Sequence, residues 1–181
     1  MKSKSGFTLM SKALNRNPLG FTLIELILYM SIVSIIIGAL VPFAWNIIEG
    51  SSKSSVQQEV SSQARFVSEK IKYEIRNASS INSPAAGASA ATLNLNSSPT
   101  TIIDLSSGKV RISKDGGSSY VNLNSNDTLV SGLTFTSYTS SDNKTKHIQF
   151  TFTIDDTGTS GRQEYQVPAV TIEGSAEVRS N

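Results

Sequence analysis

The sequence predicts an α+β protein in which a long N-terminal helix packs on an antiparallel β-sheet head. Three observations predict this fold. Residues 21–48 are mostly apolar and carry a single charge, residues 56–78 repeat apolar positions every three or four residues, and the chain from residue 91 alternates apolar with polar residues. The expected segments are a basic leader (1–20), a transmembrane helix (21–48), an amphipathic helix (49–82) and a β-rich head (83–181).

The leader is short, polar and positively charged. Its only charges are Lys2, Lys4, Lys12 and Arg16, so removal of residues 1–20 would change the formal net charge of the 181-residue chain from +2 to −2. The basic charge balance therefore belongs to the leader and does not indicate nucleic-acid binding. The chain has no cysteine, which excludes disulfides, cysteine-ligated zinc and thiol chemistry.

The apolar run that follows is long enough to cross a membrane. The 20 residues from Leu26 to Trp45 carry no formal charge, and about 20 apolar residues span a bilayer as a helix. Because every leader charge is positive, the leader is expected in the cytoplasm and the remainder of the chain outside. We therefore expect a single-pass inner-membrane protein with an extracytoplasmic head.

Beyond the membrane segment, one apolar stripe predicts an amphipathic helix that packs on its own sheet. Polar residues fill the other faces, and the solvated side is expected to include Glu69, Lys70, Lys72, Glu74 and Arg76. Residues 77–88 are expected to end the helix and form a flexible link. The stripe consists of Val56, Val60, Ala64, Val67, Ile71, Ile75 and Ala78.

The remainder of the chain favours antiparallel strands joined by hairpins. The clearest strand is 148–154, with four apolar side chains on one face and three polar ones on the other. Shorter alternations occur at 93–95, 110–112 and 133–135. Glycine-bearing breaks at 106–108 and 115–117 predict turns, and Pro168 predicts an edge strand or a bulge because proline cannot donate to a β-ladder.

The N-terminal motif resembles a known processing site. The run Gly20-Phe21-Thr22-Leu23-Ile24-Glu25-Leu26, between a basic leader and an apolar helix, is similar to the cleavage site of type IV prepilins and type II secretion pseudopilins. The resemblance implies that a prepilin peptidase cuts between Gly20 and Phe21 and methylates the amine of Phe21. It also implies assembly with other pilin or pseudopilin subunits on an inner-membrane platform.

Glu25 has a physical argument of its own. A carboxylate in an apolar helix is costly in hydrocarbon, about 2.5–3.5 kcal/mol at the bilayer centre, so it needs a cationic partner. Cleavage after Gly20 would create a positive amine on Phe21 at a similar depth. A pairing of this amine with Glu25 of a neighbouring helix would set the register between subunits. The alternative is a hydrated Glu25 at the interface with no role in assembly.

Within the apolar helix, Ser34 and Gly38 form a small-xxx-small pair that permits close helix packing in lipid. Pro42 would clash with the carbonyl of Gly38, four residues earlier, which predicts a kink. The alternative is a proline that the membrane helix simply tolerates.

The head offers no strong catalytic or metal motif. His147 is the only histidine and no nucleophile-elbow glycines surround any serine, so no enzyme activity and no cofactor are predicted. Calcium could bind Asp142, Asn143, Asp155 and Asp156, but these residue types are also common in turns. The cations Lys109, Arg111 and Lys114 have only Tyr120 nearby for base stacking, so the pattern favours a solvated strand face over nucleic-acid binding.

Two function classes remain open. The first is a structural subunit of a pilus or of a secretion or competence pseudopilus, where the helix and strand-rich head resemble a minor subunit of the PilW/J-like kind. The second is a membrane-anchored or secreted binding protein that does not polymerise. The mass of the mature N-terminus distinguishes them.

Overall fold

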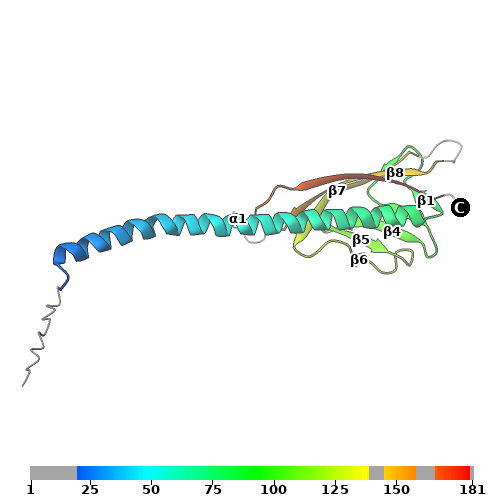
Figure 1. The fold of residues 1–181 in the computed structure, drawn as a ribbon. Coiled ribbons are helices and arrows are strands. Elements are labelled where there is room, and N and C mark those ends of the chain that lie inside the picture. The colour runs from blue at the N-terminus through cyan, green and yellow to red at the C-terminus, as the bar shows by residue number, and fades with distance from the viewer. Residues whose placement is uncertain (1–19, 139–144, 158–165, 180–181) are drawn as a thin grey trace, which may run out of the picture. The chain divides into compact units, whose positions relative to one another are not determined.

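The computed structural model describes residues 20–138, 145–157 and 166–179, which form one long helix and nine strands (Figure 1). The chain divides into two compact units, Met1–Trp45 and Asn46–Asn181, and the helix contributes to both. The elements are α1 (Leu23–Asn77), β1 (Ser80–Ser83), β2 (Ser89–Ala90), β3 (Leu93–Asn96), β4 (Thr101–Ser106), β5 (Lys109–Ser113), β6 (Val121–Asn122), β7 (Thr128–Ser137), β8 (His147–Asp156) and β9 (Val170–Glu177).

The first unit contains the apolar part of α1. Its large apolar side chains between Phe21 and Ile48 are 47–77% exposed, and none of the most apolar 18-residue stretch is buried inside the protein. A helix satisfies its own backbone hydrogen bonds, so it can present such a surface to lipid. The α1 helix therefore has the length and composition of a membrane span.

The second unit is an α+β head, as the sequence predicts. Figure 1 shows the green, C-terminal part of α1 running beside the strands, with the labels β7 and β8 on one side of it and β4 and β5 on the other. The predicted stripe is confirmed as core: it is buried from Val60 to Ala78, and Val56 packs against it while partly exposed. Its 3.6-residue period turns one face of the helix toward the sheets.

The β head consists of two antiparallel sheets rather than one. Sheet A has the strand order β1-β3-β4-β5-β6 and sheet B the order β2-β7-β8-β9. The alternation predicted at 148–154 is confirmed in β8, where Ile148, Phe150, Phe152 and Ile154 are all buried. The turn predicted at 106–108 joins β4 to β5, and both of its central residues, Ser107 and Gly108, have positive φ, as a two-residue hairpin turn requires.

A buried polar network fixes the crossing from sheet A to sheet B. Asn124 accepts a hydrogen bond from the Val110 amide at 2.9 Å and donates one to the Thr128 carbonyl at 2.9 Å. Lys109 Nζ donates to the carbonyls of Ser125 and Thr128 at 2.5 and 2.7 Å. These bonds satisfy polar groups that the short strand β6 leaves without a ladder partner, so the chain can leave one sheet and enter the other.

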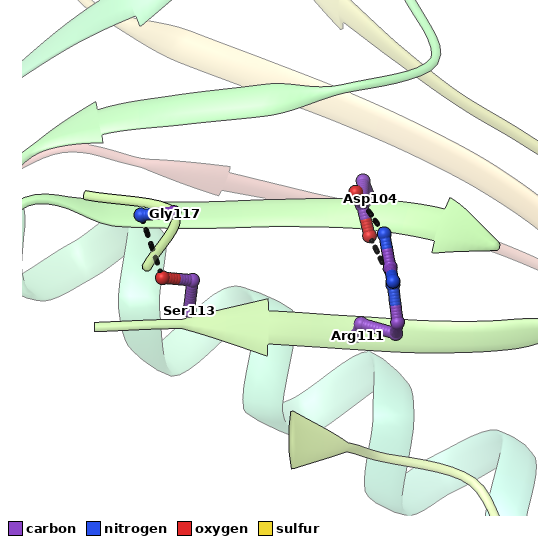
Figure 2. Close-up of polar contacts among 4 residues, drawn as sticks. All are labelled: Asp104, Arg111, Ser113 and Gly117. Carbon is purple, nitrogen blue, oxygen red and sulfur yellow. Dashed lines mark hydrogen bonds and ion pairs between the residues drawn. The ribbon is translucent and has the colours of Figure 1, made fainter. Parts of the chain in front are cut away.

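The outer face of sheet A is held by a cross-strand ion pair. Asp104 on β4 and Arg111 on β5 are register partners, and Arg111 donates two hydrogen bonds to the carboxylate at 2.9 and 2.7 Å (Figure 2). The same guanidinium lies 4.4 Å from the centre of the Tyr120 ring. Figure 2 also shows the Gly117 amide donating to Ser113 Oγ, which begins the turn after β5.

Two sequence-based expectations need correction, and a third is confirmed. Glu74 does not belong to the solvated face, because its side chain is only 6% exposed and Lys70 and Lys114 pair with it. The α1 helix ends at Asn77, and residues 80–83 form β1, not part of a flexible link. The edge strand predicted near Pro168 is confirmed, since β9 forms an edge of sheet B, and it begins two residues after the proline, at Val170.

Candidate functional site

The candidate site begins where α1 begins. Thr22 is the N-cap: its hydroxyl oxygen accepts a hydrogen bond from the Glu25 amide at 3.3 Å, and its carbonyl accepts one from the Leu26 amide at 3.1 Å. A threonine three residues before a glutamate is a capping-box sequence, and the glutamate also favours the positive end of the helix dipole. The helix start therefore falls three residues after Gly20.

The Gly20–Phe21 bond precedes the helix and is exposed. Both residues lie outside regular secondary structure, and the Phe21 side chain is 76% exposed. A Cβ placed on Gly20 would meet no atom within 4 Å, and the residue does not adopt the left-handed backbone conformation. Neither packing nor backbone geometry in this structure requires glycine at residue 20.

Glu25 shares its first helical turns with two aromatic residues. Tyr29, one turn later, donates its hydroxyl hydrogen to Glu25 Oε1 at 3.2 Å. The ring of Phe21 packs edge-on against the ring of Tyr29, with 6.2 Å between their centres. The residue after the expected cut, the carboxylate and a hydroxyl donor thus form one local cluster.

The small-residue strip lies farther along the exposed helix. The hydroxyls of Ser31 and Ser34 donate to the carbonyls of Ile27 and Met30, at 2.8 and 2.7 Å. A Cβ on Gly38 would meet open space beyond its own helix. The helix continues through Pro42. A kink at this residue stays a prediction from the sequence.

Of the head residues considered for catalysis or calcium binding, three lie on β8. His147 lies at the start of β8 beside the Tyr138 ring, and Asp155 and Asp156 end the same strand. Asp142 and Asn143 lie outside the described residues. Within the described ranges, no three side chains of the His, Asp or Glu type converge on a position that could hold a metal ion.

The three cations considered for nucleic acid each have a protein partner. Lys109 is bound to backbone carbonyls, Arg111 to Asp104 and Lys114 to Glu74. Tyr120, the candidate for base stacking, is covered by Arg111. These side chains stabilise sheet A and its loops.

An open groove of about 670 Å³ lies beside the exposed face of α1 in the head. Phe66 and Tyr73, 54% and 56% exposed, lie two helical turns apart along it. Its charged lining residues are Glu69, Lys70, Arg76, Lys114 and Arg179.

Sequence reasoning missed Thr22 and Tyr29 as parts of the site. Both could have been found from spacing alone. Thr22 and Glu25 match the capping-box pattern, and Tyr29 follows Glu25 by four residues, the separation at which helical side chains meet.

The comparisons with known proteins match only the N-terminal region. Residues 15–41 match the family model described as the prokaryotic N-terminal methylation motif. No curated protein and no solved structure gives a significant match to the chain. The match covers Gly20, Phe21 and Glu25 and indicates prepilin-type processing, as in type IV pilins and pseudopilins.

Proposed function

We propose that this chain is a structural subunit, of the minor kind, of a type IV pilus or a pseudopilus. A prepilin peptidase cuts the precursor after Gly20 and methylates Phe21, and the mature protein assembles through α1. The observation that carries the proposal is the methylation motif at residues 15–41, at the start of an exposed apolar helix that is followed by an α+β head.

The local structure supports cleavage between Gly20 and Phe21. A peptidase must bind an extended peptide, and this bond lies before the helix with both flanking residues exposed. Since the fold does not require glycine at residue 20, its presence is accounted for by an outside constraint, such as a peptidase that accepts no side chain there.

Assembly through Glu25 follows from the charge created by the cut. An α-amine has a pKa of about 8 in water, so the new terminus on Phe21 is largely positive near neutral pH, and N-methylation leaves an amine that can carry this charge. In hydrocarbon an ammonium and a carboxylate at the same depth attract strongly because screening is weak. Glu25 of one subunit and Phe21 of the next would then fix their relative height.

The partners follow from this route. They are the prepilin peptidase, the inner-membrane assembly platform, other pilin or pseudopilin subunits, and the lipid bilayer that surrounds α1 before assembly. The N-terminus lies in the cytoplasm and the head outside, because all leader charges are positive. After assembly the protein forms part of an extracytoplasmic or cell-surface filament.

Mass spectrometry of the mature N-terminus tests the processing step. The expected result is a chain that begins with N-methylated Phe21. A chain that keeps Met1, or one that is cut downstream of Ala44, would instead support an anchored or secreted binding protein that does not polymerise.

A substitution tests the assembly step. Glu25→Ala should leave cleavage intact and reduce incorporation into purified filaments, whereas Glu49→Ala, which removes a carboxylate from the same helix outside the apolar run, should preserve both. Normal incorporation of the Glu25→Ala protein would overturn the assembly role. The stoichiometry of the protein in these filaments separates a minor from a major subunit.

A further inference from the structure

Glu25 enters the membrane helix without a cationic side chain in the apolar part of that helix. It is the only charged side chain between Phe21 and Ile48, and in the uncut precursor the nitrogen of Phe21 is an uncharged amide. Water can hydrate a carboxylate at the membrane surface but not in hydrocarbon. Before assembly, therefore, some group of the same helix must bind the carboxylate, or the helix must shift until water reaches it.

Tyr29 is the donor that remains when the other polar side chains are considered. The Thr22 hydroxyl caps the helix by accepting from the Glu25 amide, and among the described contacts it makes no hydrogen bond to the Glu25 carboxylate. Ser31 and Ser34 donate to carbonyls of their own helix. Among the described residues of the apolar run, the donor to the Glu25 carboxylate is the Tyr29 hydroxyl, at 3.2 Å.

Phe21 restricts the orientation of Tyr29. The two rings meet edge-on at 6.2 Å, although both side chains are otherwise more than half exposed. Edge-to-face pairs are favourable, so the tyrosine ring is biased toward the turn that carries Glu25. Only Oε1 receives the tyrosine hydroxyl, which leaves Oε2 as an acceptor for a second donor.

We propose that Tyr29 is a positioning residue that holds the Glu25 carboxylate within the apolar layer while the subunit is unassembled. The hydroxyl replaces part of the lost hydration and keeps one carboxylate oxygen open. This inference rests on the proposed function for its purpose: the open oxygen is the one that the amine of a neighbouring Phe21 would approach. The hydrogen bond between Tyr29 and Glu25 lies within a single helix, so it can be tested on an unassembled subunit in a bilayer.

The test uses the uncut full-length chain, which lacks the free amine of Phe21. Because the chain has no cysteine, Ser31→Cys introduces a single thiol two residues beyond Tyr29. The purified protein is reconstituted into phospholipid vesicles, and its labelling by a water-soluble maleimide present on both sides of the bilayer is timed. Only a thiol that reaches water ionises and reacts quickly.

The expected result is a coupling between Tyr29 and Glu25. Tyr29→Phe keeps the ring contact with Phe21 but removes the donor, so the helix should shift toward water and the labelling rate should rise about threefold to tenfold. In the Glu25→Ala background, the same Tyr29→Phe substitution should leave the rate unchanged. Tyr73→Phe, in the head, is the matched control.

Two outcomes would overturn the proposal: an unchanged rate in the Tyr29→Phe protein, or an equal rise in the Glu25→Ala background. If Tyr29→Phe impairs reconstitution, the tyrosine Raman doublet is compared with and without Glu25→Ala in a protein whose other four tyrosines are replaced by phenylalanine, so that the signal comes from Tyr29 alone. An unchanged doublet would also overturn the proposal. Neither measurement needs cleavage or a filament, so a failure here leaves the proposed function standing. An uncut N-terminus in cells would refute that function without affecting this result.

Discussion

The carboxylate of Glu74, buried on α1, lies 3.0 Å from Lys114 Nζ in the segment that follows β5. Lys70 Nζ approaches the same Oε1 from one helical turn earlier, at 2.7 Å. Neither ammonium has the angles of a regular hydrogen bond to this oxygen, so charge attraction is the main interaction. Of the two lysines, Lys114 connects the helix to the end of β5 in sheet A, and Lys70 adds a second positive charge from the helix itself.

Removal of both lysines should leave Glu74 buried without a cation. The double variant Lys70→Met/Lys114→Met is expected to lower the free energy of unfolding by on the order of 3 kcal/mol, because a buried charge loses its compensation. Glu74→Met should cost less, since the two lysines, 30% and 52% exposed, can then be hydrated. Urea unfolding of the full-length protein in detergent measures both; a larger loss for Glu74→Met would contradict this account.

Asp115 makes the stability of the head depend on acid. Hydrogen bonds from the Ser113 and Ser119 hydroxyls and from the Ser119 and Ser118 amides lower the pKa of its carboxyl well below the ordinary value of 3.8. The folded state thus favours the charged form, and this stabilisation is complete above pH 3.8 and disappears as the pH falls toward the lowered folded pKa.

The stability of Asp115→Asn should therefore differ from that of the parent protein by a constant amount at pH 5–7, and the difference should narrow below about pH 4. Thermal unfolding of the two proteins across this range measures it. A gap that stays constant down to pH 2 would show that the charge of Asp115 has no part in stability.

Gly174 on β9 is expected to be intolerant of a side chain. It pairs with Phe150 across the strands of sheet B, and a Cβ at this residue would collide with the Phe150 ring. Gly174→Ala should lower the free energy of unfolding by about 1–3 kcal/mol through overpacking. Ser175→Ala, at the adjacent exposed position, should change it by less than about 0.5 kcal/mol. Equal effects in urea unfolding would reject the packing argument.

Gly38, in contrast to Gly174, is expected to tolerate a side chain without loss of stability. Its Cβ position meets no atom of the protein outside its own helix, so Gly38→Leu should leave the unfolding of the head and the cleavage after Gly20 unchanged. If subunits pack closely along Ser34 and Gly38, the leucine should reduce incorporation into filaments severalfold. Ile37→Leu is the matched control, and full incorporation of Gly38→Leu would exclude this face from assembly.

The parts of the fold with a strong local pattern could be predicted from the sequence. The helical stripe and the alternation in β8 are confirmed because each pattern repeats over several residues with one face buried. The end of β9 could not be predicted, because Glu173, Gly174 and Ser175 lack apolar alternation. Their strand depends on pairing with β8, a partner distant in the sequence.

The candidate site shows the same division. The motif around Gly20, Phe21 and Glu25 is readable because its residues are adjacent in the sequence. The burial of Glu74 could not be predicted from the sequence. It depends on Lys114, 40 positions later in the chain, and on the packing of α1 against sheet A. Charged residues beside an apolar stripe are usually solvated, and only tertiary structure identifies the exception.

The open surroundings of Gly20 mean that folding and maturation respond to separate sets of substitutions. A Gly20→Val protein should keep the melting behaviour of its head, since a Cβ on this residue would meet no atom within 4 Å. If the peptidase needs glycine there, such a protein would accumulate in the membrane as a well-folded precursor with its basic leader attached. A substitution can therefore remove the processing signal and leave the fold of the head intact, or disrupt the fold and leave the signal intact.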